Sequence, residues 1–386
     1  MSSEPINKPA EPEISLAERV FWLFVRVVIC VVLIALFIWF VRPKPGVVDF
    51  DISGDTMGTL YHVILAGVPE YEDKTAVETE IQRELDKIDS LMSTFKDDSE
   101  VSRFNVSEST DWFTVSAETA EVVALAIDVS RLTDGAFDVT VAPLAALWGF
   151  DSKASHAQEP PTQDVIDNTL KSVGWQHLEV RREPPAIKKS LPQLQIDLSG
   201  IAKGYAVDAV AALLERKKIT NYLVEIGGEV RTSGTKQAGV AWVAGIENPV
   251  LDDQKDATVF TKVEMKNNAL ATSGDYRSYR SFDTLRVSHI IDPRTGSPLE
   301  RMTTEVAGHS TSVSIIDPDE HLASVSILAP KCAKADALAT AMFVLGETKA
   351  TELAEKEKIP MLMLYRNKNV NTRIRTVESK TFPKTR

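Results

Sequence analysis

The sequence predicts an α+β fold, a mixed α/β body with antiparallel sheets, preceded by one N-terminal transmembrane helix. Three observations support this prediction. Residues 20–41 form an uninterrupted apolar run in which Arg26 is the only charge. Beyond it, segments that alternate apolar and polar residues, as strands do, are interspersed with segments whose apolar residues recur every three or four positions, as in helices. Residues 49–66 indicate two neighbouring strands around a tight turn at Met57-Gly58-Thr59.

The apolar run is long enough to span a membrane. As a helix rising about 1.5 Å per residue, residues 20–41 extend roughly 33 Å, against a hydrocarbon core of about 30 Å. Arg26 lies near the start and can reach the interface with its long side chain. Trp22 and Trp39 lie near the two ends, where interfacial aromatic residues are favoured. A cleaved signal peptide fits less well, because its apolar region is usually only about 7–15 residues long.

Composition divides the rest of the chain. It predicts a disordered cytoplasmic tail, a linker, a globular domain and a polar tail, which span residues 1–19, 42–48, 49–366 and 367–386. The net charge of −12 argues against a nucleic-acid partner. The two cysteines, Cys30 in the apolar run and Cys332 in the body, exclude a disulfide framework.

Helical and strand-like segments follow one another through the domain. Apolar periodicity predicts helices over residues 75–92, 116–133, 164–173, 200–215 and 333–345, the last of which ends at Gly346. Strand-like patterns occupy residues 194–198, 222–226, 242–246, 259–265, 288–291, 310–316, 324–328 and 360–365. Residues 153–162 are polar, contain a double proline and predict a loop.

One candidate site lies on the last predicted helix. Asp336 and Thr340 are four positions apart and therefore share a helix face. A carboxylate and a hydroxyl together suit a hard, oxygen-binding cation such as Mg²⁺ or Ca²⁺. Two ligands do not complete a site, and a solvated helix face is an equally simple explanation of this spacing.

A second candidate is the junction at residues 195–204. A predicted strand delivers Asp197, a turn containing Gly200 follows, and a helix begins that carries Lys203. The N-terminus of a helix presents free backbone N–H groups and favours phosphates and other anions. The spacings GxxxxGK[ST] and GxGxxG are both absent, so this is neither a P-loop nor a dinucleotide fingerprint. An ordinary capped turn remains the alternative.

A third candidate is His289, which precedes the turn Asp292-Pro293-Arg294-Thr295-Gly296. A histidine in this position could serve as a general base near neutral pH, or it could be a structural residue. The motifs HExxH and CxxC are absent, which argues against zinc.

Taken in order, these segments resemble the ApbE family, the FAD:protein FMN transferases, also called flavin-trafficking proteins. The resemblance covers about residues 50–365. It rests on Met57-Gly-Thr, Met92-Ser-Thr-Phe95, Ser99-Glu-Val-Ser-Arg103-Phe-Asn105, Asp134-Gly-Ala-Phe-Asp138-Val-Thr-Val-Ala-Pro143, Trp148-Gly-Phe, Asp197-Leu-Ser-Gly-Ile-Ala-Lys203-Gly-Tyr-Ala-Val-Asp208, Gly227-Gly228, Thr272-Ser-Gly, His289-Ile-Ile-Asp-Pro-Arg-Thr-Gly296, and Ala335-Asp336 with Thr340.

The resemblance implies a T-fold-related body and an Mg²⁺-dependent transfer of FMN from FAD to a Thr or Ser hydroxyl of a target flavoprotein, with release of AMP. It implies that the Gly200 carbonyl, Asp336 and Thr340 bind the metal. His289 would deprotonate the acceptor hydroxyl, and Asp292 would orient His289. The positions expected to line the FAD site are Met57, Phe95, Ala136, Phe137, Asp138, Asp197, Lys203 and Ile291.

The chain departs from the family pattern in a few places. Phe95 replaces a tyrosine that is often found there, Ala339 stands where some relatives have a second carboxylate, and residues 301–321 form an insertion. The retained helix over residues 20–41 also differs from the lipoprotein or cleaved-signal forms of many relatives.

Two further activities remain open from sequence, a membrane-tethered flavin-binding protein and an FAD pyrophosphatase. The family implies acceptor flavoprotein subunits of membrane redox complexes as partners. It also implies an inner-membrane, single-pass location with the catalytic domain on the periplasmic side.

Overall fold

The computed structural model describes residues 15–41, 46–151, 159–249, 258–275, 279–282, 285–299, 301–303, 320–367 and 374–384. The chain forms two compact units. One comprises Met1–Gly46 and Pro69–Tyr71, and the other comprises Val47–Val68 and Glu72–Arg386.

The first unit contains the helix α1 (Leu16–Val41), which begins four residues before the predicted span. Among the residues that the structure describes, no helix is long and apolar enough to cross a membrane. The membrane span over residues 20–41 therefore stays a prediction. Most of the predicted tail and linker, residues 1–14 and 42–45, lie outside the described residues.

The second unit is built on an eight-stranded sheet, in the order β1-β2-β6-β7-β10-β16-β17-β18. Adjacent strands from β2 to β18 pair in antiparallel fashion. The predicted turn at Met57 is confirmed, because Met57 and Gly58 have the positive φ angles, 48° and 72°, that a tight hairpin needs. The strands are β1 (Val47–Thr56), β2 (Thr59–Pro69), β6 (Tyr222–Ile226), β7 (Glu229–Ser233), β10 (Ala269–Gly274), β16 (Glu320–Ala329), β17 (Met361–Asn367) and β18 (Ile374–Glu378).

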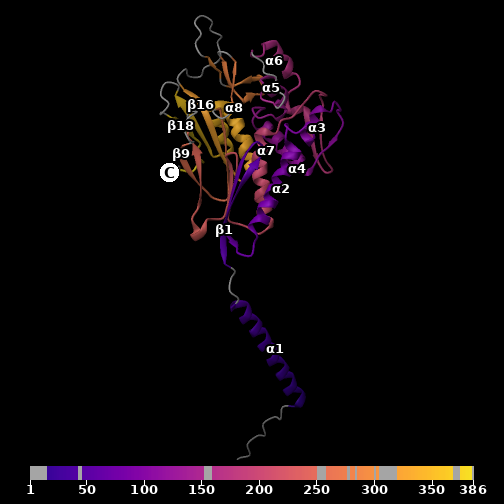
Figure 1. Cartoon of the computed structure of the whole chain (residues 1–386), viewed down its shortest axis with the longest axis vertical. Coiled ribbons are helices and arrows are strands. Elements are labelled where there is room, and N and C mark those ends of the chain that lie inside the picture. Colours follow the sequence, from indigo (N-terminus) through magenta and orange to yellow (C-terminus); the bar gives the residue numbers. More distant parts are fainter. Residues whose placement is uncertain are drawn as a thin grey trace, which may run out of the picture. The chain divides into compact units, whose positions relative to one another are not determined.

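Helices cover one face of this sheet (Figure 1). They are α2 (Lys74–Met92), α7 (Ser199–Arg216) and α8 (Cys332–Glu357), with α4 (Ala117–Leu132) packed against them. The predicted stripe of α2 is confirmed, since its buried side chains follow helical spacing and are Val77, Ile81, Leu85, Ile88 and Met92. Beyond α4 lies a small sheet in the order β3-β5-β4, formed by β3 (Phe113–Thr114), β4 (Leu178–Arg182) and β5 (Pro185–Lys189).

The opposite face of the main sheet carries a second apolar core. It is closed by the hairpin of β8 (Trp242–Glu247) and β9 (Val259–Met265), whose Trp242 packs with Leu270 and Leu364 of the sheet. A third core lies around Trp148 and Phe282. It is built from α5 (Ala142–Leu147), α6 (Gln163–Leu170), β11 (Tyr279–Phe282), β12 (Leu285–Ser288) and β13 (Ile291–Asp292), and β14 (Ser297–Pro298) and β15 (Arg301–Thr303) pair with β13 and β12. Short 3₁₀ turns occupy Val139–Val141, Trp175–His177 and Gln237–Gly239.

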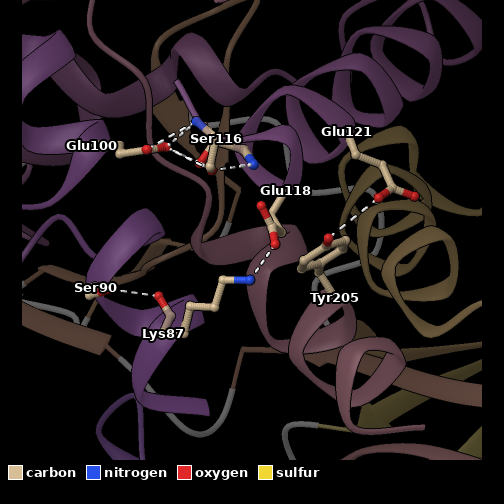
Figure 2. A network of polar contacts seen from close by, with 8 residues as sticks. Lys87, Ser90, Glu100, Ser116, Glu118, Glu121 and Tyr205 are labelled. Atoms are coloured by element: carbon tan, nitrogen blue, oxygen red, sulfur yellow. Dashed lines mark hydrogen bonds and ion pairs between the residues drawn. The ribbon is translucent and has the colours of Figure 1, made fainter. Parts of the chain in front are cut away.

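Polar contacts tie the helices to one another (Figure 2). Glu100, on α3 (Glu100–Val106), accepts hydrogen bonds from the backbone N–H and the hydroxyl of Ser116, at 2.9 and 2.8 Å. Ser116 is the N-cap of α4. Lys87 of α2 pairs with Glu118, and the Tyr205 hydroxyl on α7 donates to Glu121 at 3.4 Å. The helices α2, α3, α4 and α7 are therefore joined by side chains as well as by apolar packing.

Some sequence predictions differ from the structure. Residues 194–198 form no strand in any described sheet, because side chains from other elements take up their backbone hydrogen bonds. The predicted helix over residues 333–345 breaks at Gly346, where φ is 69°, and then resumes to Glu357. The polar tail predicted from composition contains an ordered strand, since β18 pairs with β17 and Phe382 is buried. The predicted strand over residues 310–316 and most of the loop 153–162 lie outside the described residues.

Candidate functional site

The start of α7 lies directly against α8. The backbone N–H of Gly204 donates a hydrogen bond to Asp336 Oδ2 at 3.0 Å. A Cβ atom at Gly204 would lie 2.5 Å from the carbonyl oxygen of Cys332, so only glycine permits this approach. The absence of a side chain at Gly204 therefore sets the position of the Asp336 carboxylate beside the first turns of α7.

A buried ion pair lies beside this carboxylate. Lys203 Nζ lies 2.6 Å from Glu229 Oε1, and the Glu229 side chain is 3% exposed. Burial raises the pKa of both Glu229 and Asp336, and the nearby Asp336 carboxylate raises the pKa of Glu229 further. Burial opposes the charge on Lys203, but the carboxylates of Glu229 and Asp336 outweigh it and raise the pKa of Lys203.

Glu229 was missed by the sequence reasoning. It follows the glycine pair Gly227-Gly228 at the first position of β7, and its Oε2 atom is buried with no hydrogen-bond partner among the described residues. The available signal was a carboxylate directly after two glycines. Glu229 is buried because β7 packs against α7, and a local sequence pattern does not reveal that contact.

The three predicted metal ligands come together in space. A Cβ atom at Gly200 would lie 3.6 Å from Thr340 Oγ1, which places the first turn of α7 against the face of α8 that carries Asp336. Thr340 Oγ1 is also hydrogen-bonded to Ser273 Oγ at 3.0 Å. Ser273 lies near the end of the main-sheet strand β10. Like Glu229, it was not among the expected site residues.

The donor set fits a hard cation. Carboxylate, hydroxyl and carbonyl oxygens are the ligands that Mg²⁺ prefers. When both buried carboxylates are ionised they carry one negative charge more than Lys203 neutralises, and a bound cation would offset that charge and favour the ionised forms. No group of three or more His, Cys, Asp and Glu side chains that could hold a metal occurs in the described ranges, so this set depends on one carboxylate.

The segment Ala136-Phe137-Asp138 also borders Gly200. A Cβ atom at Gly200 would lie 3.2 Å from Phe137 Cε2. Ala136, Phe137 and Asp138 are all buried. Asp138 accepts hydrogen bonds from the Thr140 N–H at 2.8 Å and from the Trp175 N–H at 2.7 Å, and burial raises its pKa. Asp138 is therefore the residue that fixes this loop.

The turn at Met57 reaches the same region. A Cβ atom at Gly227 would lie 2.9 Å from Thr59 Cγ2 and 3.5 Å from Lys203 Cδ, so the β1–β2 turn, the Gly227 turn and Lys203 are neighbours. An open depression beside this turn is lined by Met57, Gly58, Thr59, Leu60, Asp55, Thr56, Asp86 and Asp89.

Phe95 lies in a loop at the edge of that depression. Its side chain is 68% exposed. The next residue, Lys96, forms an ion pair with Asp89 at 2.6 Å, which holds the loop beside the depression. The role of Phe95 in binding a flavin stays a prediction.

The Asp197 side chain accepts hydrogen bonds from the first residue of α7. Asp197 Oδ1 accepts hydrogen bonds from the Ser199 N–H at 2.8 Å and from the Ser199 hydroxyl at 2.5 Å. These bonds satisfy donors at the free N-terminus of α7, three residues before Gly200. Asp197 therefore shapes the helix start on which Gly200 and Lys203 lie.

His289 is exposed on the third core. Its ring faces that of Phe150 edge-on, with centroids 6.5 Å apart. Asp292 is buried and accepts three hydrogen bonds from Arg294, at 2.8 to 2.9 Å. Ile291 is buried where β13 pairs with Pro298. The carboxylate of Asp292 is thus held by Arg294, and its predicted effect on His289 stays a prediction.

Arg294 connects this turn to the Asp134–Asp138 loop. A Cβ atom at Gly135 would lie 3.8 Å from Arg294 Cγ. The hydrogen bond to Asp292 and the nearby charge of Asp134 raise the pKa of Arg294. The His289 turn and the loop that contacts Gly200 are therefore adjacent.

Comparison with known proteins agrees with this arrangement. The ApbE family model matches residues 57–363. The FAD:protein FMN transferase of Vibrio cholerae serotype O1 is 40% identical over 315 residues, which cover 82% of this chain and 87% of that protein. The protein of the same name from Haemophilus influenzae is 38% identical over 325 residues, covering 83% and 87%.

Solved structures agree as well. The flavin transferase ApbE from Vibrio cholerae superimposes with a TM-score of 0.72 at 36% identity, covering 87% of this chain and 98% of that one. The apo flavinyl transferase ApbE of Pseudomonas stutzeri gives a TM-score of 0.70 at 30% identity, covering 87% and 97%. Because the ApbE family model matches most of this chain, the chain belongs to the ApbE family.

Proposed function

We propose that this chain is an FAD:protein FMN transferase, which moves FMN from FAD to a Thr or Ser hydroxyl of a target flavoprotein and releases AMP. The observation that carries the proposal is the meeting of the first turn of α7 with α8. It gathers the oxygen atoms of Asp336, Thr340 and Gly200 beside the Lys203–Glu229 pair. Oxygen ligands next to a lysine suit a pyrophosphate and its metal ion.

The proposed chemistry is phosphoryl transfer. The acceptor oxygen forms a bond to the phosphorus of the FMN half, the pyrophosphate bond breaks, and the bridging oxygen leaves with AMP. Asp336, Thr340 and the Gly200 carbonyl would hold Mg²⁺, which neutralises charge on the pyrophosphate when bound.

The chain's own residues supply the remaining parts. Lys203 offers a positive charge to the phosphates, and Glu229 holds its ammonium group in place. His289, exposed on its turn, accepts the proton of the acceptor hydroxyl at a ring nitrogen. Asp292 and Arg294 hold that turn next to the Asp134–Asp138 loop. Phe137, buried against Gly200, closes the side of the site.

The experiment is a transfer assay with the full chain in detergent, FAD, Mg²⁺ and an acceptor domain that carries a Ser/Thr-Gly-Ala-Thr-like segment. We expect covalent flavin fluorescence on the acceptor in a denaturing gel, and loss of labelling for Asp336→Ala or after chelation. Asp128→Ala is the matched control, because Asp128 lies exposed on α4, where it pairs with Arg131.

Three other outcomes would reject parts of the proposal. Release of free FMN and AMP with no labelled acceptor would identify an FAD pyrophosphatase. Bound FAD without turnover would identify a flavin-binding protein. Full labelling by Asp336→Ala would show that the metal ligands are assigned wrongly.

The proposal extends to location. We place the chain in the inner membrane as a single-pass protein, with the catalytic body on the periplasmic side and membrane redox flavoprotein subunits as acceptors. The support is the apolar run 20–41, followed within a few residues by the domain. Protease added to spheroplasts should digest the body, and protection of the body would overturn this placement.

A further inference from the structure

The segment that leads into α7 is held in an unusual way. Leu194, Ile196 and Leu198 are fully buried, yet residues 194–198 belong to none of the sheets in the described part of the chain. Buried backbone N–H and C=O groups need hydrogen-bond partners. The partners of this segment therefore have to come from elsewhere in the fold.

Asn105 supplies two of them. Its Nδ2 donates to the carbonyl oxygen of Ile196 at 2.8 Å, and its Oδ1 accepts from the N–H of the same residue at 2.8 Å. One side-chain amide thus does for Ile196 what a neighbouring strand does for a residue in a sheet. The two residues are 91 positions apart in sequence, so the contact joins α3 to the entrance of α7.

Lys189 supplies a third partner. Its side chain is fully buried, and its Nζ donates to the carbonyl oxygens of Leu194 at 2.8 Å and Phe104 at 3.3 Å. The ammonium also lies 4.8 Å from the centroid of the Phe104 ring. Desolvation of this ammonium lowers the pKa of Lys189 and outweighs the opposing effect of the Glu108 charge. The same segment is thus held from α3 and from β5.

The element that carries Asn105 is itself anchored. The hydroxyl of Ser99, its N-cap, donates to the Ser93 carbonyl at 2.6 Å. Glu100 accepts from Ser116 and, at 2.7 Å, from the hydroxyl of Thr119 (Figure 2). The helix α3 is short, but these contacts join it to α2 and α4, so Asn105 projects from a fixed support.

The held segment ends at the candidate site. Directly after Ile196, the N–H of Asp197 donates to the Val139 carbonyl at 2.7 Å, and the Asp197 carboxylate accepts from the Ser199 N–H at the start of α7. Gly200 and Lys203 follow within two turns of that helix. A shift of Ile196 would move Asp197 and the Gly200 carbonyl together.

We infer that Asn105 is a positioning residue of the transfer site. Its amide fixes the backbone of Ile196 and so the place of Asp197 and of the first turn of α7 against Asp336. The inference rests on the proposed function, because that function assigns the metal to Gly200, Asp336 and Thr340. It also explains why the motif Ser99–Asn105 belongs to this site, although none of its residues takes part in the proposed chemistry.

The test compares Asn105→Ala with Ser379→Ala in the full chain. Ser379 is the matched control, since its buried hydroxyl also joins two backbone groups, accepting from the Met361 N–H at 2.9 Å and donating to the Ile359 carbonyl at 2.8 Å. Met361 opens β17 and Ile359 lies just before it, and this segment carries none of the proposed site residues.

Four quantities are measured for each variant. They are the melting temperature without ligands, its shift on adding Mg²⁺ with FAD, the Mg²⁺ concentration at half-maximal rate, and the separate values of kcat and KM for FAD. We expect both variants to melt lower. Only Asn105→Ala should lose the ligand-induced shift and require about 10–100-fold more Mg²⁺, as is usual when a residue that supports metal ligands is removed.

Two results would overturn the inference. One is an Asn105→Ala enzyme whose ligand-induced shift, Mg²⁺ requirement and KM match those of Ser379→Ala. If Asn105→Ala does not fold, Asn105→Asp is used. It has nearly the same volume and keeps an acceptor for the Ile196 N–H, but it places a carboxylate oxygen against the Ile196 carbonyl where the donor was. The second result that would overturn the inference is a wild-type Mg²⁺ requirement in that variant. Asp336→Ala is measured alongside, because wild-type activity there would reject the metal assignment whatever Asn105 does.

Discussion

Lys203 and Glu229 form an ion pair 2.6 Å long in which the carboxylate is almost fully buried and the ammonium is about two-thirds buried. Glu229 opens β7 directly after two glycines, and Lys203 lies in the second turn of α7. The contact therefore fixes the helix start against the sheet. It also leaves one carboxylate oxygen of Glu229 without a partner among the described residues.

Removal of the lysine should destabilise the fold strongly. In Lys203→Met, Glu229 stays buried without its counter-charge, and losing one partner of a buried pair typically costs about 3–5 kcal/mol. Urea unfolding of the full chain measures the free energy of unfolding. Lys217→Met is the control, because its partner Glu80 is more exposed and such pairs contribute about 0–1 kcal/mol. Equal losses in the two variants would contradict this prediction.

Local patterns predicted some of these features and not others. The hairpin at Met57, the stripe of α2 and the shared face of Asp336 and Thr340 follow from spacing along one element, and the structure has them. The positions of Glu229 and Asn105 depend on contacts between elements far apart in sequence. Spacing carries no information about such contacts, even though Glu229 directly follows the Gly227-Gly228 motif and Asn105 ends the motif that begins at Ser99.

The same limit explains why the strand predicted over residues 194–198 is absent and why composition did not reveal β18 in the tail. Residues 194–198 alternate apolar and polar side chains because one face is buried, but Asn105 and Lys189 take the place of a neighbouring strand. The tail has a polar composition, yet β18 lies at the edge of the sheet, where one backbone edge and little apolar surface suffice for pairing.

Gly200→Ala should lower activity with little effect on stability. Alanine favours a helix over glycine by about 1 kcal/mol. The added methyl group would lie 3.2 Å from Phe137 and 3.6 Å from the Thr340 hydroxyl, so it intrudes on the proposed metal site. We expect a change of less than about 1 kcal/mol in unfolding free energy and at least about a tenfold fall in kcat/KM.

The control for that variant is Gly245→Ala. There the new Cβ atom would also lie 3.2 Å from a side chain, that of Val259, but in the β8–β9 hairpin. Its transfer rate should equal that of the wild type. A Gly200→Ala enzyme with wild-type kcat/KM would argue against Gly200 as a metal ligand.

Gly204→Ala should behave differently from Gly200→Ala. Its Cβ atom would meet backbone atoms of α8, at 2.5 Å from the Cys332 oxygen and 2.8 Å from the Ala333 Cα, and backbone cannot rotate away. Separating the two helices should cost about 1–3 kcal/mol or more. It should also abolish labelling, because Asp336 moves with α8. Circular dichroism melting and the transfer assay check both effects, and an active, stable variant would contradict the close helix contact.

Asp138 should make stability depend on pH. Burial raises its pKa above the ordinary value of 3.8, so over a window above that value the folded state keeps a proton that the unfolded chain has lost. Its contribution to stability is therefore complete below pH 3.8 and is lost as pH rises through the folded-state pKa. The slope cannot exceed about 1.4 kcal/mol per pH unit for one group.

The measurement is the difference in unfolding free energy between the wild type and Asp138→Asn, from about pH 4 to about pH 7. The asparagine variant loses the acceptor for one of the backbone N–H groups of Thr140 and Trp175 at every pH, which shifts the difference without changing its slope. We expect the wild type's advantage to fall with rising pH and then level off. An advantage that grows with pH would show that the carboxylate is favoured in its charged form.

Arg366 and Asp275 form the most buried ion pair of those described, with side chains 3% and 2% exposed and the closest atoms 2.8 Å apart. The pair joins β17 to Asp275, two residues after Ser273, and the guanidinium also donates to the Pro249 carbonyl after β8 at 3.2 Å. Asp275→Leu alone should cost about 3–5 kcal/mol, because it strands a buried arginine. Arg366→Met in addition should restore much of that loss, since apolar replacement of both partners is often neutral. A double variant as unstable as the sum of the two single variants, measured by urea unfolding, would show that the charges do not act as a pair.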